Sequence, residues 1–141
     1  MFENTPPPMW APLPQMESPR TNPSRIAIKA QGKILFIDPA EVVTVEAQGN
    51  YVFFQRTSGS AFLLRQSLSV VAEKLLPYGF VRIHRSALVN AAYVEEIHCW
   101  TTGEYVLRIQ GGKEFPVSRT FRKNLHSITP LWLGTDGFPP D

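Results

Sequence analysis

The hydrophobic residues between positions 26 and 117 come in short runs, several of which alternate with polar residues and end near a glycine. An alternation of period two is typical of a strand buried on one face, and a glycine between two such runs indicates a hairpin. The predicted turns contain Gln31-Gly32, Ser58-Gly59-Ser60, Thr102-Gly103 and Gly111-Gly112. The pattern therefore predicts a mostly β fold built from antiparallel hairpins.

One helix is expected at residues 67–77, where SLSVVAEKLLP has apolar residues three or four positions apart. This spacing gives a helix a single apolar face, which would cover a sheet. The face consists of Leu68, Val71, Ala72 and Leu75. Ser67 is placed to accept a hydrogen bond from the free N–H groups of the first turn, so we expect it to cap the helix.

A second helix is expected at residues 118–128, SRTFRKNLHSI, with Ser118 as its N-cap. Phe121, Leu125 and Ile128 fall on one side of such a helix. The opposite side carries the basic residues Arg119, Arg122, Lys123 and His126. A solvated cationic face is one interpretation, but this face has no acidic residue to form the pairs that usually stabilise an exposed helix.

The stretch FVRIHRSALVN, residues 80–90, combines a strand pattern with many hydrogen-bond donors. If FVRIH is a strand, its residues alternate between an apolar face and a polar face that holds Arg82 and His84. One interpretation of Arg82 is a buried ion pair with a carboxylate, for which Glu46 and Glu95 are the candidates.

The strand pattern ends near Arg85, and SALVN then predicts a tight turn or a short helical turn. Ser86 could cap this turn, and Asn90 tolerates the left-handed conformation that would close it. Such a turn would lift His84, Arg85 and Ser86 to an exposed rim, anchored by the apolar residues around them.

The segment AQGNY, residues 47–51, joins two strand-like runs through Gly49 and places Asn50 and Tyr51 at the edge of a hairpin. The forked donors of arginine and asparagine read base edges, whereas hydroxyl groups and histidine suit phosphate oxygens. The polar tips of the two turns therefore indicate a surface for nucleic acid.

The 141-residue chain is 43% hydrophobic and 18% charged, which predicts one domain with a packed core. Seven of its 13 prolines lie in residues 1–24, which we interpret as a flexible leader before a domain at 25–128 and a tail at 129–141. The single cysteine can form no intrachain disulfide. Because no apolar run reaches the ~20 residues of a membrane span and the start is unlike a secretory signal, we expect a cytoplasmic protein.

Residues 25–128 hold 13 Lys/Arg and 8 Asp/Glu, a net charge of +5, which permits a polyanionic partner. The sequence contains no catalytic motif that we recognise. His98 and Cys99 are adjacent, so in a strand they would point to opposite faces and could not form a nucleophile–base pair. The three histidines also lack the spacing of metal ligands. We therefore expect no enzyme activity, no metal site and no cofactor.

Four phrases of this sequence resemble, in the same order, the LytTR DNA-binding domain of bacterial transcription regulators. They are VVTVEAQGNYVFF, LLRQSLSVVAEKL, FVRIHRSALVNAAYVEEI and FPVSRTFRKNL. The third is similar to the most distinctive signature of the family, and the resemblance covers roughly residues 34–128. It implies an elongated, mostly β arrangement of small antiparallel sheets with two short helices.

Members of that family bind imperfect direct repeats in double-stranded DNA, using loops and a helix end in the major groove instead of a helix-turn-helix. The resemblance therefore implies a sequence-specific bacterial transcription regulator. It also implies a sensor or receiver protein and RNA polymerase as further candidate partners, and no membrane. Residues 1–24 could be part of a linker to such a sensor or receiver domain.

Carried over by position, the residues expected to contact base edges are Tyr51, Arg85 and Arg119. Those expected to contact phosphate are Asn50, Arg65, Ser67, His84, Ser86, Arg122 and Lys123. Some members have histidine at the position of Tyr51, so the base preference there is open. The asparagine of the family motif corresponds to Asn90, which we assign to shaping the turn.

The main alternative is a β module that binds single-stranded nucleic acid or a small ligand, since Tyr51, Phe53, Phe54 and Trp100 could stack on bases. A stacking protein should prefer single strands, whereas a major-groove reader should prefer duplex DNA that contains repeats. A further alternative is a protein-interaction module that acts through residues 1–24.

Overall fold

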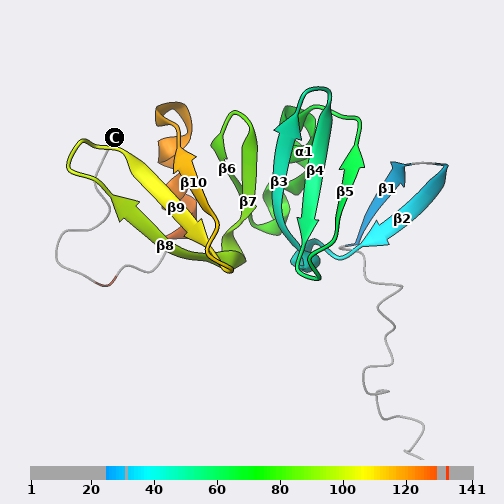
Figure 1. Ribbon diagram of the computed structural model, residues 1–141, viewed down its shortest axis with the longest axis horizontal. Helices are drawn as coiled ribbons and strands as arrows, with labels where there is room; N and C mark the ends of the chain where they lie inside the picture. Colours follow the sequence, from blue (N-terminus) through cyan, green and yellow to red (C-terminus); the bar gives the residue numbers. More distant parts are fainter. Residues whose placement is uncertain (1–24, 31, 130–132, 134–141) are drawn as a thin grey trace, which may run out of the picture.

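The computed structural model describes residues 25–30, 32–129 and 133, so the predictions for the leader at 1–24 and for most of the tail at 129–141 lie outside the described residues. The elements, in chain order, are β1 (Ile26–Ala30), β2 (Lys33–Ile37), η3 (Pro39–Glu41), β3 (Val42–Gln48), β4 (Tyr51–Arg56), β5 (Ala61–Leu64), α1 (Leu68–Leu75), η4 (Leu76–Tyr78), β6 (Phe80–His84), β7 (Ala87–Asn90), η5 (Ala91–Tyr93), β8 (Val94–Cys99), β9 (Tyr105–Ile109), β10 (Glu114–Val117) and η6 (Arg119–Ile128). Figure 1 shows three sheets side by side along the long axis of the molecule.

The central sheet has five antiparallel strands in the order β5-β4-β3-β7-β6, and α1 packs against it. Leu68, Val71 and Leu75 of α1 are buried in the first hydrophobic core, as the periodicity predicts. The Ser67 hydroxyl accepts a hydrogen bond from the Val70 N–H at 3.2 Å, so the predicted N-cap is also confirmed. The helix gives way to η4, which ends at Gly79 with a left-handed φ of 88°.

The two-stranded sheet β1-β2 closes one end of this core with the buried side chains of Ile28 and Ile37. Ile34 and Phe36 lie on the other face of β2 and are exposed. The antiparallel pairs β1-β2, β4-β5, β8-β9 and β9-β10 meet at the glycine-containing breaks of the sequence. The predicted hairpins are therefore confirmed.

A second core lies between the central sheet and the three-stranded sheet β10-β9-β8, with η6 packed against it. Ile83 and Val89 of the central sheet enter this core, whereas Phe80 and Leu88 of the same two strands enter the first core. Strands β6 and β7 are consequently buried on both faces.

Burial on both faces explains why one prediction is wrong. The segment Ala87–Asn90 is a fully buried strand, not a turn, and the turn itself contains only Arg85 and Ser86. A short apolar run that is buried on both sides has no polar alternation, so its pattern does not distinguish a strand from a compact turn.

Asn90 also differs from its prediction, because it has an extended conformation, φ −82° and ψ 118°, and not a left-handed one. Its amide donates to the Val42 carbonyl at 2.9 Å, and its side-chain oxygen accepts from the Ala92 N–H at 3.0 Å. The side chain therefore satisfies backbone groups inside the fold and caps η5.

The second predicted helix is present with 3-10 geometry as η6. Leu125 is fully buried in the second core and Ile128 packs half-buried against it, as predicted, whereas Phe121 is half-buried against the Arg82 guanidinium. Ser118 occupies the N-cap position, but its side chain makes no capping bond.

The predicted fold class, a mostly β arrangement of small antiparallel sheets with two short helices, is confirmed. Within the described part of the chain, none of the helices has the length and apolar character needed to span a bilayer. The same residues contain no group of three or more His, Cys, Asp or Glu side chains that could hold a metal ion.

Candidate nucleic-acid interface

Three turning points of the chain lie on one edge of the molecule. Figure 1 shows the β3–β4 turn, the β6–β7 turn and the beginning of η6 along its upper edge. Two backbone hydrogen bonds connect them: the Ala47 N–H donates to the Ser86 carbonyl at 2.9 Å, and the Ser118 N–H donates to the Ile83 carbonyl at 2.8 Å. We call the surface formed by residues 49–51, 65–67, 84–86 and 119 the turn edge.

The second of these bonds lies at an irregularity in β6. The pairing of β6 with β7 shifts by one residue between Arg82 and His84, and the Ile83 carbonyl accepts the Ser118 N–H. Such bulges bend a strand locally and redirect its side chains. Arg119, the first residue of η6, is thereby held next to the β6–β7 turn.

The β3–β4 turn is two residues long and joins the paired residues Gln48 and Tyr51. Gly49 has a φ of 60°, a left-handed conformation that glycine adopts at little cost. Asn50 is exposed at the tip, and Tyr51 is 44% exposed beside it. Both side chains are therefore accessible on the turn edge.

The junction between β5 and α1 supplies Arg65 and Ser67. Because Leu64 pairs with Val52 across β4 and β5, Arg65 follows at the level of Tyr51. The oxygen of Ser67 is used as the acceptor of the helix cap, but its O–H remains available as a donor.

In the β6–β7 turn, the side chains of His84 and Ser86 are bonded to each other. The Ser86 N–H donates to His84 Nδ1 at 3.2 Å, so Nδ1 is an acceptor and the proton of the neutral ring is on Nε2. The Ser86 hydroxyl oxygen lies 2.9 Å from the same Nδ1. The Nε2–H is consequently the ring donor that a bound molecule could use.

Several basic side chains at this edge and on η6 have no acidic partner among the residues that the structure describes. They are Arg65, Arg85, Arg119 and Lys123, and all four are exposed. Elsewhere, three basic residues pair with acids, in Arg56–Glu41, Arg108–Glu96 and Lys113–Glu46. An unpaired guanidinium keeps five N–H donors in a planar fork, so it can bind an anion or two acceptors on one base.

The turn edge lies inside a segment that matches a known family. The sequence model of the LytTr DNA-binding domain matches residues 32–129 of this chain, well over half of its length. The chain belongs to the LytTr DNA-binding domain family. The LytTr match begins within the β1–β2 hairpin and ends after η6, so it contains the whole turn edge.

Among related proteins, the chain is 29% identical to the sensory transduction protein LytT of Bacillus subtilis over 104 residues, 74% of this chain and 43% of that protein. It is 33% identical to LytT of Oceanobacillus iheyensis over 103 residues, 72% of this chain and 42% of that protein. This chain thus spans less than half the length of these curated relatives. A solved LytTr DNA-binding domain from Bacillus cereus, 22% identical, superposes with a TM-score of 0.63 over 78% of this chain and 100% of that one, which supports the same fold.

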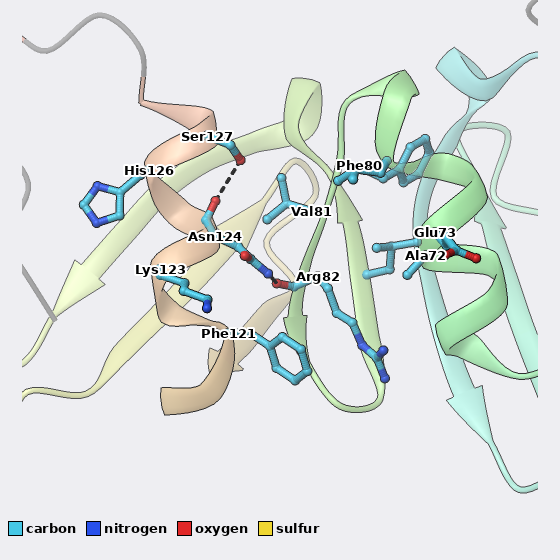
Figure 2. Close-up of a pocket in the computed structure, with 12 residues that line it drawn as sticks. Ala72, Glu73, Phe80, Val81, Arg82, Phe121, Lys123, Asn124, His126 and Ser127 are labelled. Carbon is cyan, nitrogen blue, oxygen red and sulfur yellow. Dashed lines mark hydrogen bonds between the residues drawn. The ribbon is translucent and has the colours of Figure 1, made fainter.

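Behind the turn edge, this LytTr domain has a groove of about 530 Å³ between α1 and η6 (Figure 2). Phe80, Val81 and Leu88 contribute to its apolar lining. Figure 2 shows Phe121 and the Arg82 side chain at the end of the groove nearest the β6–β7 turn. The groove therefore separates the two helices, and Arg82 and Phe121 close one end of it.

Sequence reasoning missed how Arg82 is used in this LytTr domain. The expected ion pair with Glu46 or Glu95 is wrong, because Glu46 bonds to Lys113 at 2.7 Å and the Arg82 guanidinium bonds to backbone carbonyls and a hydroxyl group. An arginine on the predicted polar face of β6 indicates a side chain with hydrogen-bond partners, but the sequence does not show which groups these are.

Arg122 lies differently from the other basic residues of η6. Its Nη2 donates to the Gly103 carbonyl at 2.7 Å, and its guanidinium lies over the Tyr105 ring at 4.8 Å. In a 3-10 helix, side chains three positions apart are aligned, so Arg122 lies on the same side as the buried Leu125, which explains why it packs against the sheet. The prediction that it lies opposite the apolar side is wrong.

Among the described residues, the four aromatic side chains predicted to stack on bases do not form one platform. Phe54 is buried and stacks on Phe62 with ring centroids 5.0 Å apart, and Phe53 is half-buried. Tyr51 and Trp100 are exposed, but they belong to turns of different sheets. Since single-strand binding proteins stack successive bases on neighbouring rings, the arrangement does not favour that alternative.

Proposed function

We propose that this LytTr domain binds double-stranded DNA sequence-specifically through the turn edge and that it regulates transcription. The observation that carries the proposal is the placement of unpaired guanidinium groups at separate turns along one edge. A duplex presents phosphates along both sides of each groove, so an extended edge with several cationic tips is complementary to it.

The spacing of the tips supports a major-groove site. The β3–β4 and β6–β7 turns are two strands apart in the central sheet, which is roughly 10 Å at the usual strand spacing. The major groove is about 12 Å wide and displays a distinct pattern of acceptors and donors for each base pair. The tips of both turns are therefore close enough to reach base edges in one major groove, while other side chains of the same turns contact the phosphates at its border.

We assign base contacts to the exposed side chains at the tips, Tyr51, Arg85 and Arg119. Phosphate contacts are assigned to Asn50, Arg65, Ser67, His84, Ser86 and Lys123. For Arg122 we propose a supporting role, since its guanidinium is bonded to the Gly103 carbonyl and packed on Tyr105. Its contribution to DNA binding would then be to hold η6 against the three-stranded sheet.

The target is proposed to be an imperfect direct repeat, with one copy of the domain on each half. Two copies bind the same face of the duplex when the half-sites are separated by whole helical turns, about 10.5 base pairs each. Selection of bound sequences from random duplex DNA by the purified chain tests this directly. We expect enrichment of repeated half-sites, whereas equal recovery of all sequences, or preferential binding of single strands, would contradict the proposal.

Replacing Lys123 by alanine should weaken binding to all duplexes to a similar degree, because an ammonium group contacts phosphate and carries no base information. The slope of log K against log salt concentration should become shallower by about 1. The measurement is titration of a selected and an unrelated duplex at several salt concentrations. Lys74→Ala is the matched control, since Lys74 is exposed near the other end of α1 and its loss should change the slope much less.

Input to this regulator is proposed to come from a sensor or receiver protein, and its output to reach RNA polymerase. The similar proteins named as sensory transduction proteins are more than twice as long as the matched segment, which supports a signalling part outside it. Binding to bacterial DNA requires access to the chromosome, so we propose that the protein acts in the cytoplasm.

A further inference from the structure

Arg82 is a half-buried residue of β6 whose guanidinium reaches along the strand to the β6–β7 turn (Figure 2). Its Nη2 donates to the Arg85 carbonyl at 2.6 Å, and its Nε donates to the His84 carbonyl at 3.3 Å. Two consecutive carbonyl groups of the turn are thus bound by one planar side chain.

The same guanidinium is held by two other elements. Its Nη1 donates to the Ser69 hydroxyl of α1 at 3.0 Å, and its Cζ lies 5.0 Å from the centre of the Phe121 ring on η6. The Arg82 carbonyl accepts a hydrogen bond from Asn124 Nδ2 at 2.8 Å, which fixes η6 to the same strand. The turn, α1 and η6 therefore share Arg82 as a common contact.

Both polar groups of the Ser86 backbone are also bonded. The Ser86 N–H donates to His84 Nδ1, and the Ser86 carbonyl accepts the Ala47 N–H. Arg82 supplies the bond to the Arg85 carbonyl, the backbone group of the residue whose side chain is free at the tip. A loop that is fixed before binding loses less entropy on binding, so these contacts favour affinity without touching a ligand.

We propose that Arg82 is a positioning residue that fixes the β6–β7 turn relative to α1 and η6, and so directs the Arg85 side chain into the DNA. The inference rests on the proposed function, because it assigns Arg82 a part in the same interface. Arginine is required for this role: its planar fork reaches two carbonyls and a hydroxyl together and stacks on the ring, whereas lysine offers a single point of donation on a flexible stem.

The test is Arg82→Lys, which keeps the charge and changes only the geometry of donation. We expect affinity for the selected duplex to fall by about tenfold or more, while affinity for unrelated duplexes and the salt slope stay nearly unchanged. Arg56→Lys is the matched control, since Arg56 is a half-buried arginine at the opposite end of β4 and should leave both affinities unchanged. Equal loss on both duplexes, or no loss on the selected one, would overturn the proposal.

A double-mutant cycle separates positioning from a general structural effect. If Arg82 acts through the Arg85 side chain, Arg82→Lys should have little further effect on specific affinity when Arg85 is already alanine. A full additional loss in the Arg85→Ala background would show that Arg82 acts elsewhere and would contradict the inference.

A measurement without DNA keeps this inference distinct from the proposed function. Exchange of the Ser86 amide hydrogen in the free protein should be faster in Arg82→Lys by about tenfold or more, because the turn opens more often. If the wild-type chain failed to select any duplex but this exchange increased, the proposed function would be wrong and the positioning of the turn would stand. Unchanged exchange would refute the positioning role whatever the DNA result.

Discussion

Alanine at Arg85 or at Arg119 is expected to lower affinity for the selected duplex by about 1–3 kcal/mol each, or roughly tenfold to a hundredfold. The reason is that each guanidinium is exposed on the turn edge without an acidic partner among the described residues, and can donate two bonds to one guanine. Each variant should also relax base preference at one or two positions. The measurement is binding to the selected site and to a set of its single base-pair substitutions.

The two arginines should relax preference at different base pairs, since they come from different elements, the β6–β7 turn and η6. The loss in the double variant should be close to the sum of the single losses, because the two guanidinium groups belong to different elements and share no hydrogen-bond partner among the described residues. Arg108→Ala, which removes a half-exposed arginine paired with Glu96, controls for the lost charge and should leave base preference intact. If both variants bound the selected site as tightly as wild type, these residues would not read the DNA.

The largest effect on stability is expected from Leu125→Ala, which should lower the free energy of unfolding by about 2–5 kcal/mol. Leu125 is completely buried and is the main apolar contact of η6 with the second core. Its truncation leaves a cavity between η6 and the sheet, and domains of this size have only about 5–15 kcal/mol in total. Urea denaturation followed by circular dichroism measures the change.

Leu76→Ala is the control for this substitution, since Leu76 is 67% exposed and its truncation should change the unfolding free energy by no more than about 0.5 kcal/mol. Because η6 carries Arg119 and Lys123, Leu125→Ala should also weaken DNA binding when the protein remains folded. Equal stabilities of the Leu125 and Leu76 variants would mean that η6 is not anchored by this core.

The hairpins and α1 could be predicted because their signals are local. Each hairpin break contains a glycine, and the stripe of α1 repeats at helical spacing with a serine directly before it. The turns that carry Asn50, Tyr51 and Arg85 can also be predicted from local sequence, because each lies where a strand pattern ends.

The sequence-based predictions that are wrong depend on contacts between distant parts of the chain. The prediction of a turn at residues 86–90 is wrong because the second sheet buries a face of β7 that would otherwise be polar. Residues 86–90 carry no sequence pattern that indicates this second sheet. The partners of Arg82 lie on α1, on η6 and in the turn, and the bond between Ser118 and Ile83 joins residues 35 positions apart. Because tertiary packing determines such contacts, they cannot be predicted from local sequence patterns.

The family resemblance gives the division of the candidate residues into base and phosphate contacts, whereas the fold gives their arrangement. The sequence places the basic residues of η6 and the β6–β7 turn far apart, and the hydrogen bond from the Ser118 N–H to the Ile83 carbonyl holds the start of η6 beside that turn. On η6, Arg119 and Lys123 stay exposed, whereas Arg122 packs on Tyr105.

We propose that one edge of the molecule, made by two hairpin turns and the start of η6, contacts a single DNA duplex. Titration of the isotope-labelled protein with its selected duplex, followed by the chemical shifts of backbone amides, tests this most directly. We expect the largest changes to occur together at Asn50, Arg85 and Arg119, with little change in β1 and β2. Changes confined to β1 and β2, or to only one of the three tips, would contradict it.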